Sequence, residues 1–236
     1  MFFGPMPLQT LLFDAAGTLI RPAEAVGKTY ALHALRQGLV AEPEAIMQAF
    51  RVAWQETPPP LYPAGQTPAD DDRGWWRALV GDVFGRVLGA PLAERTLEAL
   101  FSGLYLHYAQ PQAWNVFDDV VPALEDLSRD HRLLVLSNFD RRLHSILAGH
   151  DLLRFFAQVI ISSEVGAAKP NPRMFQAALA AAGCLPQEAL HIGDDAKCDL
   201  AGAQSCEIHA FHVKRPESGL GVLVQKVRAG AYSGLH

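Results

Sequence analysis

Short apolar runs that each stop at a polar residue occur near both ends of the chain, and a long block of helical periodicity separates them. The first run covers residues 8–13 and stops at Asp14, as a buried strand of a parallel sheet does. Similar runs cover residues 132–136, 158–161, 189–192 and 207–213. Segments with helical spacing lie between these later runs, and such alternation predicts a parallel sheet with helices on both faces.

The segment between the first two runs predicts helices only. Apolar residues recur at intervals of three and four over residues 24–38, 43–55, 72–88 and 91–108. A proline-rich stretch at residues 57–65 interrupts them, and the carboxylates of residues 70–72 are expected to cap the next helix. We therefore expect an all-helical block, residues 21–114, inserted into an α/β core made of residues 1–20 and 115–236.

The helices of the core are expected to start near Asp119 and to cover residues 141–149, 172–182 and 197–204. Asn171 is a good candidate to cap the third of these helices, and Gly183 is expected to end it. The tail after Arg215 is weakly patterned, so we expect a terminal helix or partial disorder there.

The composition narrows the class of partner. The formal net charge is −5 and 19% of the residues are charged, without the stripe of Lys and Arg that binds a nucleic-acid backbone. No apolar run approaches the ~18 residues that a membrane helix needs, and the first residues lack the basic region of a secretory signal. The three cysteines form no C-x-x-C pair, which favours reduced thiols. We expect a cytoplasmic protein that binds neither nucleic acid nor membrane.

Polar residues follow or precede the predicted strands in four places. The four segments are Asp14 to Thr18, Ser137 with Asn138, Lys169 with Pro170, and Asp194 to Asp199. In an open parallel sheet, ligands bind outside the carboxyl ends of the strands. We therefore expect these distant segments to meet in one site.

The first segment offers a carboxylate at the end of a strand. An ionised Asp14 can attack a phosphorus or carbon electrophile and can hold a divalent cation, whereas the simpler alternative is an Asp that caps the following turn. Gly17 permits a tight turn, and the Thr18 hydroxyl is placed to orient the carboxylate.

The second and third segments offer groups that bind anions. The hydroxyl of Ser137 and the amide of Asn138 suit a phosphate or an oxyanion, although such residues also simply form turns. The Lys169 ammonium would neutralise a nucleophile and a transferring group; the alternative is a solvated loop lysine. The chain has only five lysines, and Lys169 directly precedes Pro170 before a predicted helix.

The fourth segment is an acidic cluster. The carboxylates of Asp194, Asp195 and Asp199 are hard oxygen ligands of the kind that Mg²⁺ prefers, and the simpler alternative is that they cap a helix. His191 lies within the apolar run before them, so we expect a buried histidine rather than a base.

In this order the four segments resemble the motifs of the haloacid dehalogenase superfamily, and the resemblance spans essentially the whole chain. It implies a Rossmann-like α/β core with an inserted helical cap that closes over the strand ends, excludes water and selects the substrate. Within that superfamily, Trp75 with Trp76, the run from Ser137 to Arg142, and Gly193-Asp194-Asp195 most resemble the subgroup called haloacid dehalogenase-like hydrolase domain-containing protein 3.

The resemblance implies a role for each of the anion-binding residues. Asp14 would be the nucleophile, and Ser137 and Lys169 would be the other catalytic residues. Thr18 and Asn138 would bind the phosphate of the substrate. The implied substrate is a small phosphorylated metabolite, whereas neither its identity nor the oligomeric state has a readable pattern in the chain.

The resemblance also implies a Mg²⁺ cofactor. Its ligands would be Asp14, the backbone carbonyl of Ala16, Asp194 and, as a further ligand, Asp195. Asp199 would support these ligands from behind. An alanine keeps its carbonyl, so the loss of a side chain at position 16 leaves this expected ligand in place.

The first motif departs from that of the family's phosphatases, which carry a second Asp where this chain has Ala16. That Asp protonates the leaving oxygen and later activates water, and such help is worth about 10²–10⁴-fold in rate. The first of three readings is a Mg²⁺-dependent phosphatase that is slow or relies on its substrate for acid–base help. The second is a carbon-centred hydrolase, and the third is a scaffold that binds a phosphometabolite without turnover.

The carbon-centred reading covers two reaction types. Dehalogenases of 2-haloacids match the Asp-Ala-x-Gly-Thr run but need no metal, and the pair Asp194 and Asp195 counts against that reading. Phosphonoacetaldehyde hydrolases carry Ala at the third position of this motif, but they need a cap lysine that forms a Schiff base. The only lysine of the helical block is Lys28, which is early in its first helix and does not fit that role.

Overall fold

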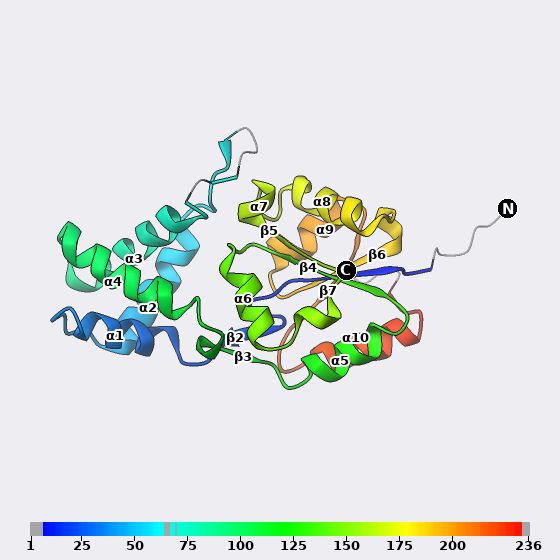
Figure 1. Cartoon of the computed structure of the whole chain (residues 1–236), viewed down its shortest axis with the longest axis horizontal. Helices are drawn as coiled ribbons and strands as arrows, with labels where there is room; N and C mark the ends of the chain where they lie inside the picture. The colour runs from blue at the N-terminus through cyan, green and yellow to red at the C-terminus, as the bar shows by residue number, and fades with distance from the viewer. Residues whose placement is uncertain (1–6, 64–66, 69, 233–236) are drawn as a thin grey trace. The chain divides into compact units, whose positions relative to one another are not determined.

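The computed structural model describes residues 7–63, 67–68 and 70–232 (Figure 1). The chain divides into two compact units, one of which is an α/β unit and the other helical. The α/β unit comprises Met1–Arg21, Tyr62–Thr67 and Val116–His236, and the helical unit comprises Pro22–Leu61 and Pro68–Asn115.

Five parallel strands form the sheet of the α/β unit, in the order β5-β4-β1-β6-β7. The strands are β1 (Thr10–Phe13), β4 (Arg132–Ser137), β5 (Gln158–Ile161), β6 (Ala189–Gly193) and β7 (His209–His212). Every residue of the central strand β1 is buried, which fits its largely apolar sequence. In the register, Leu12 of β1 pairs with Leu134 of β4 on one side and with His191 of β6 on the other.

Helices cover both faces of this sheet. They are α5 (Val120–Leu127), α6 (Arg142–Gly149), α7 (Ser162–Val165), α8 (Pro172–Ala182), α9 (Gly202–Ser205) and α10 (Leu220–Arg228). Figure 1 shows α8 and α9 on one face and α5 and α10 on the other. Leu12, Leu134 and Leu136 pack with Met174 and Phe175 of α8 in one buried cluster. The predicted Rossmann-like parallel-sheet core is confirmed.

Three local features of the α/β unit differ from the sequence prediction or complete it. The helix expected at residues 197–204 is a π-helical turn, Ala196–Ala201, followed by the short α9. Strands β2 (Ile20–Pro22) and β3 (Trp114–Val116) form a separate two-stranded sheet that the hydrophobic pattern did not indicate. The terminal segment folds as α10, so the helix alternative is confirmed for that stretch.

Four helices make up the helical unit: α1 (Val26–Leu35), α2 (Pro43–Glu56), α3 (Arg73–Leu88) and α4 (Glu94–His107). Their core is apolar and mostly aliphatic, and it includes the stacked rings of Tyr30 and Phe84, whose centroids lie 6.2 Å apart. Asp70 caps α3, because its Oδ2 accepts a hydrogen bond from Gly74 N at 2.7 Å, whereas the side chain of Asp72 makes no cap bond. Among the described residues, no helix combines the length and apolar character needed to cross a bilayer.

Candidate active site

Asp14 follows β1 directly and lies at the carboxyl end of the central strand. Its backbone N–H donates to the Ile192 carbonyl at 2.8 Å, which continues the β1–β6 pairing by one residue. The side chain is buried, and its Oδ1 accepts hydrogen bonds from Ser137 Oγ at 3.0 Å and from Lys169 Nζ at 2.8 Å. Three of the predicted catalytic residues, which are far apart in the chain, therefore meet at one oxygen atom.

Lys169 is a buried lysine whose ammonium is fully hydrogen-bonded. Its Nζ donates to Asp14 Oδ1 at 2.8 Å, to Asp199 Oδ1 at 2.5 Å and to the Leu136 carbonyl at 2.8 Å. An ammonium has three N–H groups, so all of its donors are in use. Lys169 therefore acts as a fixed positive charge between two carboxylates.

Asn138 holds the backbone of Lys169. Its Nδ2 donates to the Lys169 carbonyl at 2.9 Å, and its Oδ1 accepts from the Lys169 N–H at 2.6 Å. Asn138 was predicted to bind the substrate phosphate, but the structure uses its side-chain amide to position Lys169. The amide nitrogen and the amide oxygen of Asn138 therefore each already have a hydrogen-bond partner.

Thr18 also has a role that differs from the prediction. The residue is completely buried, and its hydroxyl donates to Asp194 Oδ1 at a long 3.5 Å. It therefore supports the acidic loop, whereas phosphate binding and orientation of Asp14 were expected.

The three aspartates of the acidic loop after β6 have different roles. Asp195 Oδ1 accepts from the backbone N–H groups of Lys197 at 2.8 Å and Cys198 at 2.6 Å, so Asp195 caps the π-helical turn. The prediction that Asp195 is a metal ligand finds no support in this geometry, which matches the simpler helix-cap alternative. The side chain of Asp194 is exposed, and that of Asp199 is buried.

Asp199 is the most heavily hydrogen-bonded carboxylate of the site. Its Oδ1 accepts from Lys169 Nζ and lies 2.8 Å from His191 Nε2, and its Oδ2 accepts from Asp195 N–H at 3.0 Å. His191 is completely buried, as expected, and its ring packs edge-on against Phe175. His191 therefore holds Asp199, which in turn holds Lys169.

Three carboxylates of the site lie close enough to share a cation. Oxygen atoms of Asp14, Asp194 and Asp199 all lie within 4.8 Å of one another. Both oxygens of Asp199 are hydrogen-bonded, whereas only Oδ1 of Asp14 has hydrogen bonds among the described residues. The donor set is all oxygen and fits Mg²⁺, with Asp14 and Asp194 best placed as direct ligands and Asp199 supporting them.

The charges of the site shift its pKa values in opposite directions. Burial raises the pKa of Asp14 to about 6; Lys169 opposes this shift, and the negative charges of Asp199 and Asp194 add to it. Burial and the charge of Asp199 likewise raise the pKa of Asp194. Burial alone would lower the pKa of Lys169, but Asp14 and Asp199 outweigh it and raise that pKa above its ordinary value.

Asp199 shows the opposite shift from Asp14. Burial would raise the pKa of this carboxyl, but Lys169 and His191 hold it well below its usual range. Asp199 is therefore ionised at neutral pH, while Asp14, which shares the same ammonium, has a raised pKa. A divalent cation would relieve the repulsion between the buried Asp14 carboxylate and Asp194.

Gly17 allows the loop after Asp14 to pass close to Asp194. Its φ is +94°, and a Cβ atom at this position would lie 2.3 Å from Asp194 Oδ2. Both the backbone conformation and the space therefore require glycine. The neighbouring Ala16 is exposed and brings no titratable side chain to this edge of the sheet.

An ion pair between Arg215 and Asp119, which the hydrophobic pattern did not indicate, braces the same loop from the C-terminal part of the chain. Arg215 Nη1 donates to both carboxylate oxygens of Asp119, at 2.7 and 2.8 Å, and its Nη2 donates to the Thr18 carbonyl at 3.0 Å. The guanidinium also lies 4.0 Å from the ring centroid of Phe117. No local pattern links Arg215 to Thr18, because 197 positions separate them.

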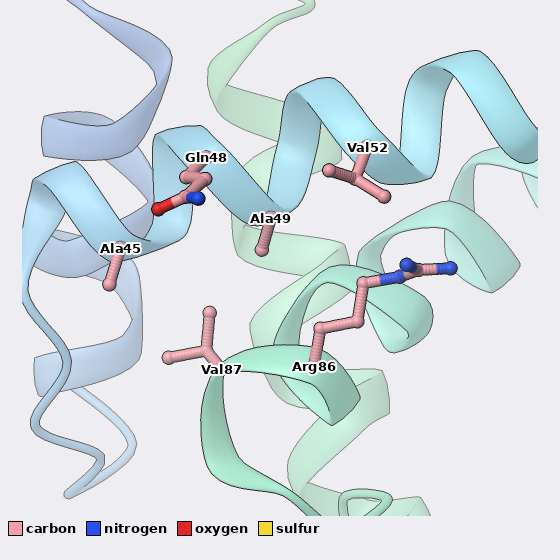
Figure 2. Close-up of a pocket in the computed structure, with 6 residues that line it drawn as sticks. All are labelled: Ala45, Gln48, Ala49, Val52, Arg86 and Val87. Atoms are coloured by element: carbon pink, nitrogen blue, oxygen red, sulfur yellow. The ribbon is translucent and has the colours of Figure 1, made fainter.

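The helical unit contains a pocket that has none of these groups. Figure 2 shows it between α2 and α3, lined by Ala45, Gln48, Ala49 and Val52 of α2 and by Arg86 and Val87 of α3. Arg86 is already paired with Asp82 and Glu56. The pocket therefore offers no free catalytic group, and the candidate active site is the edge of the sheet at Asp14.

The fold is a Rossmann-like parallel sheet, and its strand ends carry an aspartate, a fixed lysine and an acidic loop. The chain matches the haloacid dehalogenase-like hydrolase family over residues 8–207, and it belongs to that family. It is 34% identical to human haloacid dehalogenase-like hydrolase domain-containing protein 3 over 221 residues, which cover 90% of this chain and 84% of the human protein. The predicted resemblance to that subgroup is confirmed.

Solved structures share the fold at lower identity. The HAD phosphatase of Thermococcus onnurineus has a TM-score of 0.64 and 20% identity, covering 95% of this chain and 100% of that one. The L-2-haloacid dehalogenase of Xanthobacter autotrophicus has a TM-score of 0.67 and 22% identity, covering 97% of this chain and 85% of that one. Identities this low establish the fold alone, and one fold thus carries two different reactions here.

Proposed function

We propose that this chain hydrolyses a small phosphorylated metabolite in a Mg²⁺-dependent reaction with Asp14 as the nucleophile. The observation that carries the proposal is that only one oxygen of the Asp14 carboxylate is hydrogen-bonded. Ser137 and Lys169 both bind Oδ1, so Oδ2 is the oxygen available to an electrophile. In this proposal the helical unit, which supplies none of these groups, acts as the cap that selects the substrate.

The reaction proceeds in two displacements at phosphorus. Asp14 Oδ2 attacks the phosphorus atom, the bond to the leaving oxygen breaks, and its electron pair leaves with that oxygen. Water then attacks the aspartyl phosphate, loses its proton to solvent, and releases inorganic phosphate and the Asp14 carboxylate. Lys169 keeps Asp14 oriented and reduces its charge, so that a phosphate dianion can approach.

The metal belongs to the same proposal. Asp14 and Asp194, with the Ala16 carbonyl, are the groups that would hold Mg²⁺, and Asp199 would orient them through Lys169. When bound, the cation neutralises charge on the phosphoryl oxygens. The close carboxylates and the raised pKa of Asp14 support this assignment, because a cation at that point relieves the repulsion between them.

The decisive experiment measures phosphate release from p-nitrophenyl phosphate and a panel of phosphate esters, with Mg²⁺ and with a chelator. We expect release that requires Mg²⁺ and is lost in Asp14→Asn. Asp130→Asn, which changes an exposed aspartate of the same unit, is the matched control and should keep full activity. Release that persists in Asp14→Asn or in the presence of chelator would overturn the proposal.

One observation favours a second candidate, which is carbon-centred hydrolysis. A halide leaves without needing a proton, so Ala16 costs a dehalogenase nothing. Halide release from 2-chloropropionate at a rate that chelator does not change would establish the dehalogenase reaction. A Schiff base trapped on Lys28 by borohydride with phosphonoacetaldehyde would instead indicate phosphonate cleavage. Phosphate binding without any turnover would indicate a scaffold.

A further inference from the structure

The side chains around Asp14 leave no proton donor for a leaving group. Lys169 has all three N–H groups committed to hydrogen bonds, so none of them is free to point at a leaving group. The Ser137 hydroxyl donates its only proton to Asp14 itself. Neither group can protonate a departing oxygen without breaking the contacts that position the nucleophile.

The polar side chains that surround Asp14, Ser137 and Lys169 also already have hydrogen-bond partners. Thr18 is buried and donates to Asp194, and His191 is buried against Asp199. Both oxygens of Asp199 are already engaged, Oδ1 with Lys169 Nζ and His191 Nε2 and Oδ2 with the Asp195 N–H. Asp195 is an acceptor in a helix cap.

Ala16, two residues after Asp14, is exposed and adds no titratable side chain. Asp194 is the remaining carboxylate, and the cation proposed above needs it ionised. The Nε2 of His212 is engaged 3.0 Å from the Asp194 backbone carbonyl. Within the described part of the α/β unit, the site therefore contains a nucleophile and charge-stabilising groups, but none of these side chains presents an uncommitted acid or base to Asp14.

On the basis of the proposed phosphatase function, we infer that the substrate is a phosphate compound whose leaving group departs as a stable anion. Acyl phosphates, phosphoanhydrides and enol phosphates belong to this class, because their leaving oxygens are weakly basic. Alkyl phosphates such as sugar or glycerol phosphates do not, since an unprotonated alkoxide is a poor leaving group. Acid catalysis contributes about 10²–10⁴-fold where it operates, so discrimination between the two classes is of that order.

The same lack of a base has a consequence for the second displacement. The attack of Asp14 on such a substrate breaks the phosphorus–oxygen bond without proton transfer, and that step is fast. Water must then attack the aspartyl phosphate while giving its proton to solvent, with no side chain to accept it. The phosphorylated form of Asp14 therefore accumulates during turnover.

The experiment compares leaving groups in the native chain and in two variants. The substrates are acetyl phosphate, dinitrophenyl, nitrophenyl and phenyl phosphate, and glycerol phosphate, all with Mg²⁺. In the native chain we expect kcat/KM to fall steeply as the leaving group becomes more basic. Ala16→Asp should flatten this dependence and raise turnover of glycerol phosphate about 10²–10⁴-fold, whereas Ala16→Asn, which has similar size but no acid, should leave the slope steep.

A rapid-mixing measurement adds a readout that does not depend on steady-state rates. With dinitrophenyl phosphate, we expect a burst of one phenolate per native active site, which Ala16→Asp removes because it activates water. A shallow dependence on the leaving group in an active native chain would overturn the inference. So would a steep dependence that Ala16→Asp does not change. Complete inactivity of the native chain and of Ala16→Asp on every phosphate would instead overturn the proposed phosphatase function.

Discussion

The Lys169 ammonium donates to Asp14 Oδ1 at 2.8 Å, although 155 positions separate the two residues. Both side chains are almost inaccessible to solvent, with 2% of the Lys169 side chain and 10% of that of Asp14 exposed. The same ammonium bonds Asp199, so a single cation compensates two buried carboxylates. The stability of the core and the chemistry of the site therefore depend on the same residue.

Lys169→Met is expected to destabilise the fold strongly as well as to abolish activity. The change leaves Asp14 and Asp199 buried without their cation, and breaking a buried pair in this way costs about 3–5 kcal/mol. Urea unfolding near neutral pH measures the loss. Lys28→Met, which removes an exposed lysine of α1, is the control and should change the unfolding free energy by less than about 0.5 kcal/mol. Equal effects of the two substitutions would show that the buried pair is not stabilising.

The raised pKa of Asp14 predicts a stability that falls as the pH rises. The folded carboxyl, with a pKa of about 6, holds its proton more tightly than the unfolded one, whose value is 3.8. This contribution is complete below pH 3.8 and is lost as the pH rises through about 6. Asp14→Asn should remove this pH-dependent contribution to stability. Urea unfolding of the native chain and of Asp14→Asn, both free of metal, from below pH 3.8 to above about pH 6 measures the difference.

The same titration governs the affinity for Mg²⁺. A cation at Asp14 must displace its proton, so affinity should weaken about tenfold for each pH unit below the pKa of Asp14. Calorimetric titration of the native chain with Mg²⁺ at several pH values measures this slope, and proton release appears as a dependence of the heat on the buffer. An affinity that is constant through pH 6 would contradict either the raised pKa or the placement of the metal at Asp14.

Much of the sheet was predictable because each strand is an apolar run that ends at a polar residue. The run at residues 158–161 coincides with β5, and Asp14 and Lys169 meet because parallel strands deliver their ends to one edge. The tasks of the three loop aspartates were not predictable. They depend on a π-helical turn in which Leu200 N–H reaches back to the Asp195 carbonyl, and spacing alone does not indicate such a turn.

Gly17→Ala should damage the metal site more than the fold. The added methyl would collide with Asp194 Oδ2, and the backbone would keep its positive φ at a cost of about 1–3 kcal/mol. We expect Mg²⁺ binding to weaken because Asp194 must move away. Gly85→Ala is the matched control, because a Cβ there meets nothing within 4 Å and the residue lies inside α3. That control should stabilise the protein by about 0.5–1 kcal/mol, and comparable Mg²⁺ affinity in both variants would contradict the role of Gly17.

The Arg215–Asp119 brace is expected to stabilise the loop that carries Thr18. Burial alone would raise the pKa of Asp119, but its hydrogen bonds with Arg215 and Leu220 N–H lower it, so the stabilisation is present above the ordinary pKa and is lost as the pH falls below it. Arg215→Ala should cost about 1.5–3 kcal/mol, because it removes charge-assisted bonds to Asp119 and the bond to the Thr18 carbonyl.

A double-mutant cycle separates the brace from general damage. Arg215→Ala and Asp119→Asn remove the same pair, so their effects on the unfolding free energy should not add, with a coupling of about 0.5–3 kcal/mol. Arg129→Ala provides the control, since that side chain is 71% exposed and its nitrogen lies 3.9 Å from Asp126. It should change the unfolding free energy by less than about 0.5 kcal/mol, because exposed ion pairs contribute little. Strict additivity of the Arg215 and Asp119 substitutions would show that the two residues stabilise the protein independently.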